Sequence, residues 1–103
     1  MNSNKRIEDC YKIEDDNQAL SCIKGVIREV DAGETCKPRI VLLVQENCGG
    51  CAEEKAKYKN DIDSGVIQLV DIYSDDGRDI AKRNNIEAVP AVLILDCKNT
   101  LIE

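Results

Sequence analysis

Two cysteines separated by two glycines, Cys48-Gly49-Gly50-Cys51, form the most chemically distinctive motif of the sequence. Two intervening residues let one turn of the chain bring both sulfur atoms within bonding distance, so the pair can cycle between a dithiol and a disulfide. Disulfide exchange needs a thiolate, which is stabilised at a helix N-terminus by the helix dipole and by free amide N–H groups. Cys48 occupies such a terminus if a helix begins near Gly49.

The elements on either side of the motif are suited to position it. Residues 40–44 form an uninterrupted apolar run bounded by polar residues, which is the pattern of a strand buried on both faces of a sheet. Residues 52–59 are rich in helix formers, with Ala52 and Ala56 expected to face inward, and residues 61–65 break this helix. The motif therefore lies in a turn from a buried strand into a helix.

The rest of the chain reads as further alternation of strands and helices. Apolar spacings of three and four between Ala19 and Val30 predict a helix that an Asp or Asn at positions 15–17 caps. The order β-α-β-α-β-α-β-β follows, in one α/β domain over residues 1–103 with residues 1–9 as a flexible start. The remaining expected strands are residues 10–14, 66–73, 91–96 and 100–102, with a loop at 32–38, a helix ending near 84 and a turn at 97–99.

Charge and hydropathy narrow the class of partner. The net charge of −6 and the pI near 4.7 argue against nucleic acid and anionic membranes, because such contacts need clustered Lys and Arg. Residues 1–16 lack the apolar region of a signal peptide, and no stretch reaches the length of a membrane span. We therefore expect a cytoplasmic protein, although six cysteines also fit an oxidising compartment or the cytosol of a hyperthermophile.

An apolar strand, a C-x-x-C at its end, a helix and a later Val89-Pro90 before another strand together resemble the thioredoxin superfamily over roughly residues 10–103. The resemblance implies a thioredoxin-like fold with a mixed central sheet of about four or five strands and about three flanking helices. The sequence given ends at Glu103, so the final helix of the family is expected to be absent, unless the sequence is truncated. An uncovered sheet face favours a homodimer or a protein partner.

The resemblance also assigns roles to single residues. Cys48 would be the attacking thiolate, Cys51 the resolving thiol, and Pro90 a cis-proline packed beside them. Gly49 and Gly50 would border the substrate, and Val89 would contact it through its main chain. For Pro90, an ordinary proline that opens a strand is the alternative interpretation.

The implied activity is that of a thiol-disulfide oxidoreductase on protein disulfides or dithiols, recycled by an unidentified reductase or oxidant and using no cofactor. Three features depart from the family pattern: the Gly-Gly dipeptide, Asn47 in place of a Trp, and Leu42 in place of a buried acid. The carboxylates of Glu46, Glu53 and Glu54 are expected to disfavour a thiolate. The alternative is a non-catalytic thioredoxin-like binding or regulatory module with structural disulfides.

Four further cysteines remain. In the thioredoxin order, the strands at 40–44 and 91–96 are antiparallel neighbours, so Cys36 and Cys97 share the opposite end of the sheet and are predicted to form a structural disulfide. By elimination, Cys10 can pair with Cys22. The alternative is that each of these cysteines is a small buried hydrophobe.

A metal site is the remaining alternative for the C-x-x-C pair. The sequence contains no His, which excludes the common Cys/His zinc sites, and a four-thiolate site needs a second close pair. The other cysteines are scattered singly, so we expect no metal. Glutathione chemistry lacks support, since Lys55 and Lys57 are the nearest basic groups and are near only in sequence.

Overall fold

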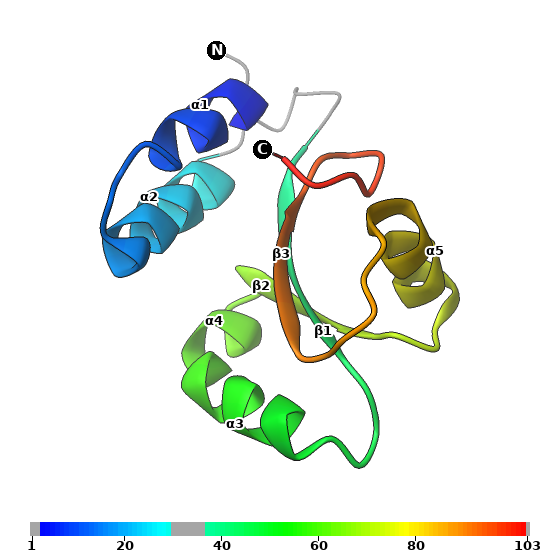
Figure 1. The fold of residues 1–103 in the computed structure, drawn as a ribbon. Coiled ribbons are helices and arrows are strands. Elements are labelled where there is room, and N and C mark those ends of the chain that lie inside the picture. Colours follow the sequence, from blue (N-terminus) through cyan, green and yellow to red (C-terminus); the bar gives the residue numbers. More distant parts are fainter. Residues whose placement is uncertain (1–2, 30–36, 103) are drawn as a thin grey trace.

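The computed structural model describes residues 3–29 and 37–102, and within them the chain forms one three-stranded mixed sheet with the order β2-β1-β3 (Figure 1). The central strand β1 (Arg39–Val44) is the predicted apolar run, and its residues after Arg39 are all buried. It pairs in parallel with β2 (Ile67–Asp71) and antiparallel with β3 (Ala91–Leu95). The predicted antiparallel neighbours are therefore confirmed.

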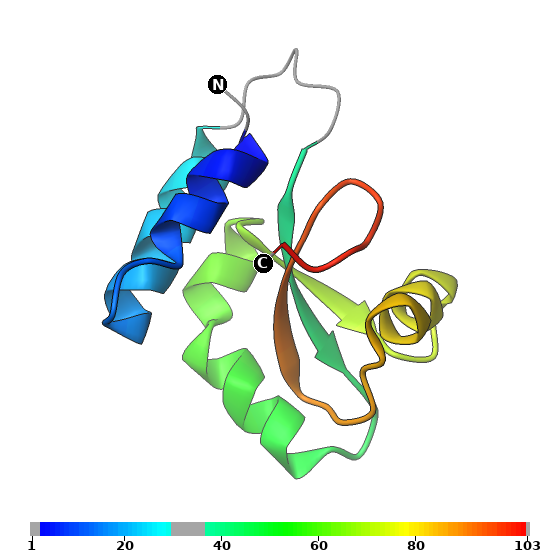
Figure 2. The same cartoon turned by 45° about the horizontal axis from the view of Figure 1, so that its top comes forward.

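Five helices are described, and they lie on both faces of the sheet (Figures 1 and 2). The first two form a helical hairpin on one face, the next two follow the C-x-x-C motif on that same face, and the last covers the other face alone. In chain order they are α1 (Ser3–Cys10), α2 (Asp16–Arg28), α3 (Gly49–Lys57), α4 (Lys59–Asp63) and α5 (Asp75–Asn84).

Two apolar clusters sandwich the sheet, because successive side chains of a strand point to opposite faces. On the face of α1–α4, Ile40 and Leu42 of β1 pack with Ile7, Ile23 and other buried residues. On the face of α5, Val41 and Leu43 of β1 pack with buried residues of β2, β3 and α5. These are Val70, Leu93, Leu95 and Ile80. The core therefore fixes β1 on both sides, directly before the C-x-x-C motif.

Capping explains where two of the helices begin. Asp15 precedes α2 in an extended conformation and its carboxylate accepts a hydrogen bond from the Gln18 N–H at 3.0 Å, which confirms a cap in the predicted segment. Ser74 caps α5 in the same way through the Gly77 N–H. Gly77 also lets α5 approach β2 closely, since a Cβ atom there would meet the carbonyl oxygen of Asp71.

The fold prediction is wrong in its elements, although the α/β class holds. Three strands and five helices are described instead of four or five strands with three helices, so the predicted thioredoxin-like sheet is not what the chain builds. Residues 3–10 are helical where a flexible start and a strand at 10–14 were expected. Ile7 and Cys10 lie three residues apart and therefore on one side of α1, and both are buried in the apolar cluster on the face of α1–α4.

The predicted last strand at 100–102 is also wrong. Only one isolated bridge, between Leu95 and Leu101, forms there. Two backbone hydrogen bonds make this bridge, from the Asp96 N–H to the Thr100 carbonyl and from the Ile102 N–H to the Ile94 carbonyl. The Leu101 N–H points away from β3 and donates to the side-chain oxygen of Asn84 on α5 at 3.0 Å. The chain is thereby drawn towards α5 after the turn.

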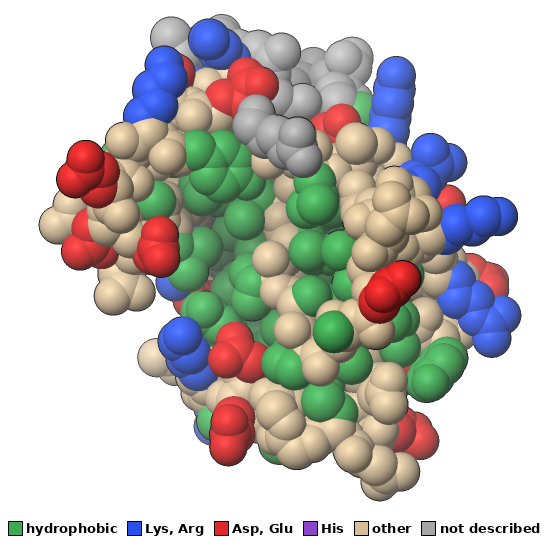
Figure 3. Space-filling model, viewed as in Figure 1, with side chains coloured by type: hydrophobic (Ala, Val, Ile, Leu, Met, Phe, Trp, Pro, Cys, Tyr) green, Lys and Arg blue, Asp and Glu red, His purple; other side chains and the backbone are tan. Residues whose placement is uncertain are grey.

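Helices cover both faces of the sheet, and one face carries the α1–α2 hairpin together with α3 and α4. Figure 3 shows hydrophobic side chains gathered in a hollow between this hairpin and β3. Val92 and Ile94 of β3 are half-buried members of the apolar cluster on this face. Neither face of the described sheet is wholly bare, and the homodimer stays a prediction.

None of the helices in the described residues combines the length and apolar character that crossing a membrane requires.

Candidate redox site

The turn between β1 and α3 presents Cys48 at one end of the sheet. Asn47 has a φ of 59°, in the left-handed region that Asn tolerates better than most residues. This turn reverses the chain, and Cys48 follows in an extended conformation as the N-cap of α3. Asn47, which stands where the family has Trp, thus has a backbone role that the sequence did not reveal.

Cys48 uses its sulfur as the capping atom of α3. Its Sγ accepts a hydrogen bond from the Cys51 N–H at 3.1 Å, which satisfies one of the unpaired amides of the first helical turn. A negatively charged sulfur gains more from this amide and from the helix dipole than a neutral thiol does. The predicted position of Cys48 at a helix N-terminus is therefore confirmed.

The two cysteines of the motif form a disulfide with a Cα–Cα distance of 5.1 Å. They differ in access to solvent, since Cys48 is half-buried and Cys51 is only 1% exposed. An incoming thiol or disulfide therefore meets Cys48 first. Once reduced, Cys51 would lie behind Cys48 and within reach of its sulfur.

Val89 and Pro90 lie directly beside the motif, as the sequence predicted. The Cys48 Sγ is 4.0 Å from the carbonyl oxygen of Val89, and the Val89–Pro90 peptide bond is cis. Gly50 faces this proline, because a Cβ atom there would stand 3.2 Å from Pro90 Cδ. A Cβ atom at Gly49 would meet nothing within 4 Å, so only the second glycine is held to its size by packing.

Charged side chains of both signs surround the motif. Glu46 and Lys55 line a hollow next to Cys48, while Glu53 is exposed and Glu54 half-buried on α3. Of the three carboxylates predicted to crowd the motif, Glu46 therefore lines the hollow beside Cys48, together with the cation Lys55. No role was predicted for Lys55; its position three residues after Ala52, which lines the same hollow, is the signal that places it near the motif.

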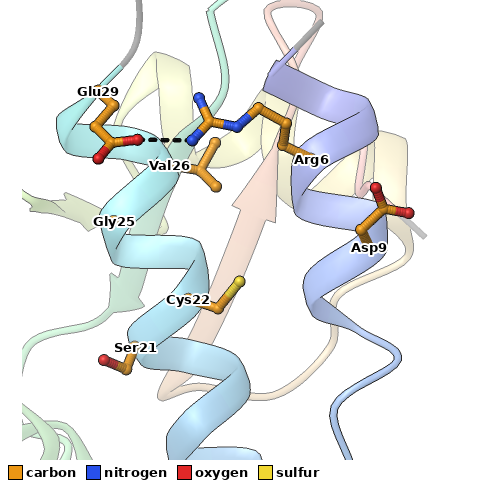
Figure 4. Close-up of a pocket in the computed structure, with 7 residues that line it drawn as sticks. All are labelled: Arg6, Asp9, Ser21, Cys22, Gly25, Val26 and Glu29. Atoms are coloured by element: carbon orange, nitrogen blue, oxygen red, sulfur yellow. Dashed lines mark hydrogen bonds and ion pairs between the residues drawn. The ribbon is translucent and has the colours of Figure 1, made fainter. Parts of the chain in front are cut away.

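The second described disulfide lies far from this chemistry. Cys10 is the last residue of α1 and pairs with Cys22 of α2 at a Cα–Cα distance of 5.7 Å, which confirms the predicted pairing. Figure 4 shows Cys22 between the two helices, below an ion pair in which Arg6 donates to Glu29 at 2.6 Å. Cys10 is only 1% exposed, and at a helix C-terminus the dipole disfavours a thiolate.

The remaining predicted pair is only partly within the described structure. Cys97 follows β3 in an exposed turn, and Cys36 lies outside the described residues. The Cys36–Cys97 disulfide therefore stays a prediction. Among the residues that the structure describes, no three or more Cys, Asp or Glu side chains gather as metal ligands would.

Comparison of the chain with models of protein families, with curated proteins and with solved structures found no match. The resemblance to the thioredoxin superfamily therefore rests on the order and spacing of the residues named above.

Proposed function

We propose that the protein is a thiol-disulfide oxidoreductase that uses Cys48 and Cys51 on protein disulfides. The observation that carries this proposal is the asymmetry of the pair: the more accessible Cys48 Sγ accepts the Cys51 amide N–H at the start of α3, whereas Cys51 is buried. This asymmetry supports the proposal, because a helix N-terminus stabilises a thiolate and the capping sulfur is the one that a substrate can reach.

In the reducing direction, the Cys48 thiolate attacks one sulfur of a substrate disulfide. The Cys48–substrate bond forms, the substrate S–S bond breaks, and the leaving sulfur takes a proton from water. Cys51 then loses its proton and attacks Cys48 Sγ, which releases the second substrate sulfur and leaves the Cys48–Cys51 disulfide. Two electrons pass to the substrate, and an external dithiol restores the pair by the reverse steps.

The surroundings of the pair fit a polypeptide substrate. The Val89 carbonyl lies 4.0 Å from Cys48 Sγ, so main-chain groups border the point of attack. Gly49 and Gly50 are exposed and carry no side chain that would obstruct an approaching chain. Substrate contacts through Val89, Pro90 and the two glycines are part of the proposal.

Turnover of insulin disulfides by dithiothreitol, followed through precipitation of the reduced chains, tests this function. We expect the wild-type protein to accelerate the reaction and Cys48→Ser to abolish the acceleration. The Cys10→Ser/Cys22→Ser double variant is the control, because it removes a disulfide outside the site; it should keep the activity wherever circular dichroism shows that it folds. Equal rates with and without wild-type protein would reject the proposal and favour a non-catalytic module.

A further inference from the structure

A second hollow lies on the α5 side of the sheet, between the turn after β2 and the loop before β3. Half-buried Ile72, Ala81 and Ile86 give it an apolar floor. Tyr73 borders the hollow and is 63% exposed, which is unusual for so large an aromatic side chain. An exposed aromatic ring beside an apolar floor is typical of a binding surface.

This hollow belongs to the same end of the sheet as the disulfide. β1 and β2 run in parallel and β3 runs against them, so the ends of β1 and β2 and the start of β3 meet there (Figure 2). The Ile72 N–H donates to the Val44 carbonyl at 2.8 Å, which fixes one wall of the hollow to the end of β1. The other wall continues from Glu87 to Val89, whose carbonyl oxygen is 4.0 Å from Cys48 Sγ.

The net charge of the residues that line this hollow is positive, whereas the net charge of the whole chain is negative. Arg78 and Lys82 line it from α5; they lie four residues apart, are both exposed, and take part in none of the ion pairs found among the described residues. The charged residues that line the hollow are therefore two cations and one carboxylate, in a chain whose net charge is −6. Glu87 is the carboxylate at the hollow, on the side of the Val89 loop.

These features select a ligand with an acidic group next to an apolar one. The cations on α5 attract a carboxylate, Glu87 repels it from the side of the loop, and Ile72, Ile86 and Tyr73 offer apolar contacts. A polypeptide in extended conformation advances about 3.3 Å per residue, so a few residues connect such a contact with a cystine at Cys48.

We propose that this hollow binds an acidic, apolar segment of the protein whose disulfide is exchanged at Cys48–Cys51. The inference rests on the proposed function, because it names the class of protein substrate for that site. Arg78 and Lys82 act as specificity residues: they bind a part of the substrate remote from the reacting sulfurs and lower KM without entering the exchange.

Two disulfide peptides that differ only in one segment test the proposal. One carries Glu-Leu-Glu about five residues from its cystine, a reach of ~16 Å, and the other carries Lys-Leu-Lys at the same place. At low ionic strength, we expect kcat/KM of the wild-type protein to be about tenfold higher for the acidic peptide. Arg78→Glu/Lys82→Glu should abolish or invert this preference through KM.

The matched control is Lys37→Glu/Lys98→Glu. It makes the same change in net charge at two exposed lysines, before β1 and after β3, at the opposite end of the sheet. This variant should keep the preference for the acidic peptide. Equal use of both peptides by the wild-type protein, or an equal loss in both double variants, would overturn the proposal.

A small uncharged disulfide, bis(2-hydroxyethyl) disulfide, separates failure of this inference from failure of the proposed function. If the wild-type protein reduces it, the redox function holds and the peptide ratios decide the inference. If it does not, fluorescence anisotropy of the labelled acidic peptide decides the inference alone. Binding that Arg78→Glu/Lys82→Glu removes and Lys37→Glu/Lys98→Glu keeps would support the hollow, and no binding would refute it.

Discussion

At the scale of single residues, the candidate site depends on where two sulfur atoms stand relative to one helix end. Cys48 caps α3 and is accessible, whereas Cys51 is turned into the core. In the other described disulfide, Cys10 lies at a helix C-terminus and is buried. The same side chain thus meets a favourable dipole at one site and an unfavourable one at the other, and only the first fits exchange chemistry.

The two glycines of the motif provide a test at this scale. Gly49→Ala should raise stability by up to ~1 kcal/mol, because Ala favours the helix and the space around Gly49 is open. Gly50→Ala should gain less and lower the exchange rate, since its Cβ atom presses on Pro90 beside the Val89 carbonyl. Urea unfolding and insulin reduction measure both effects. Identical rates and stabilities for the two variants would contradict the described packing.

At the scale of elements, the sequence predicted the core of the sheet well and its periphery poorly. The apolar run of β1 follows from the hydrophobic pattern that burial on two faces imposes, and the antiparallel position of β3 followed from the thioredoxin order. Helix formers predicted the helix after Cys51, but Ala52 and Ala56, which were expected to face inward, are exposed. Among residues 5–10, the buried apolar positions are Ile7 and Cys10, and such a short pattern does not distinguish a helix from a flexible start. The stability of α1 comes from packing and a disulfide, which local sequence does not show.

The same contrast holds within the candidate site. The motif, Val89 and Pro90 are close in space, as their order along the chain predicted. The cation Lys55 and the hollow near Tyr73 were missed, because their positions depend on how α3 and α5 are turned against the sheet. The pairing of Cys10 with Cys22 followed once the motif cysteines were set aside.

The hydrogen bonds between α5 and the turn after β3 predict that the stability of the fold depends on pH. Hydrogen bonds from Asn99 and then from Arg83 lower the pKa of Asp79 below its usual value of 3.8. The folded state therefore favours the ionised carboxylate. The ionised Asp79 carboxylate stabilises the folded state above pH 3.8. This stabilisation is lost as the pH falls through the lowered pKa that Asp79 has in the folded state.

Urea midpoints of the wild-type protein and Asp79→Asn, measured from pH 7 down to about 2.5, test this linkage. The wild-type protein should be the more stable at neutral pH, and the difference should shrink below pH 3.8. High salt should reduce the difference, because the carboxylate is near the surface. A difference that does not depend on pH would show that the carboxylate charge contributes nothing to this contact.

At the scale of the whole molecule, two layers of helices enclose a small sheet. Within one of these layers, the Cys10–Cys22 disulfide joins α1 to α2. The α1–α2 hairpin packs on the same face as α3 and α4, and the Lys24–Asp61 ion pair at 2.5 Å joins α2 to α4. A chain of 103 residues buries a limited core, so a cross-link contributes a large share of its stability. We therefore assign a structural role to the hairpin disulfide, and the proposed chemical role belongs to the motif disulfide.

Loss of the Cys10–Cys22 bond measures that structural role. The bond closes a loop with a sequence separation of 12. Because its absence frees the unfolded chain, Cys10→Ser/Cys22→Ser should lower the free energy of unfolding by about 3 kcal/mol. Urea unfolding provides the value. An unchanged midpoint would mean that packing alone holds α1 and α2 together.

Trapping of a mixed disulfide tests the central claim most directly. In Cys51→Ser, the resolving thiol is gone, so attack by Cys48 on a peptide disulfide should stop at a covalent adduct. Mass spectrometry of the digested protein should find one peptide bound, through Cys48, and dithiothreitol should release it. No adduct, or an adduct on Cys10 or Cys22 in place of Cys48, would contradict the assignment of Cys48 as the attacking thiolate.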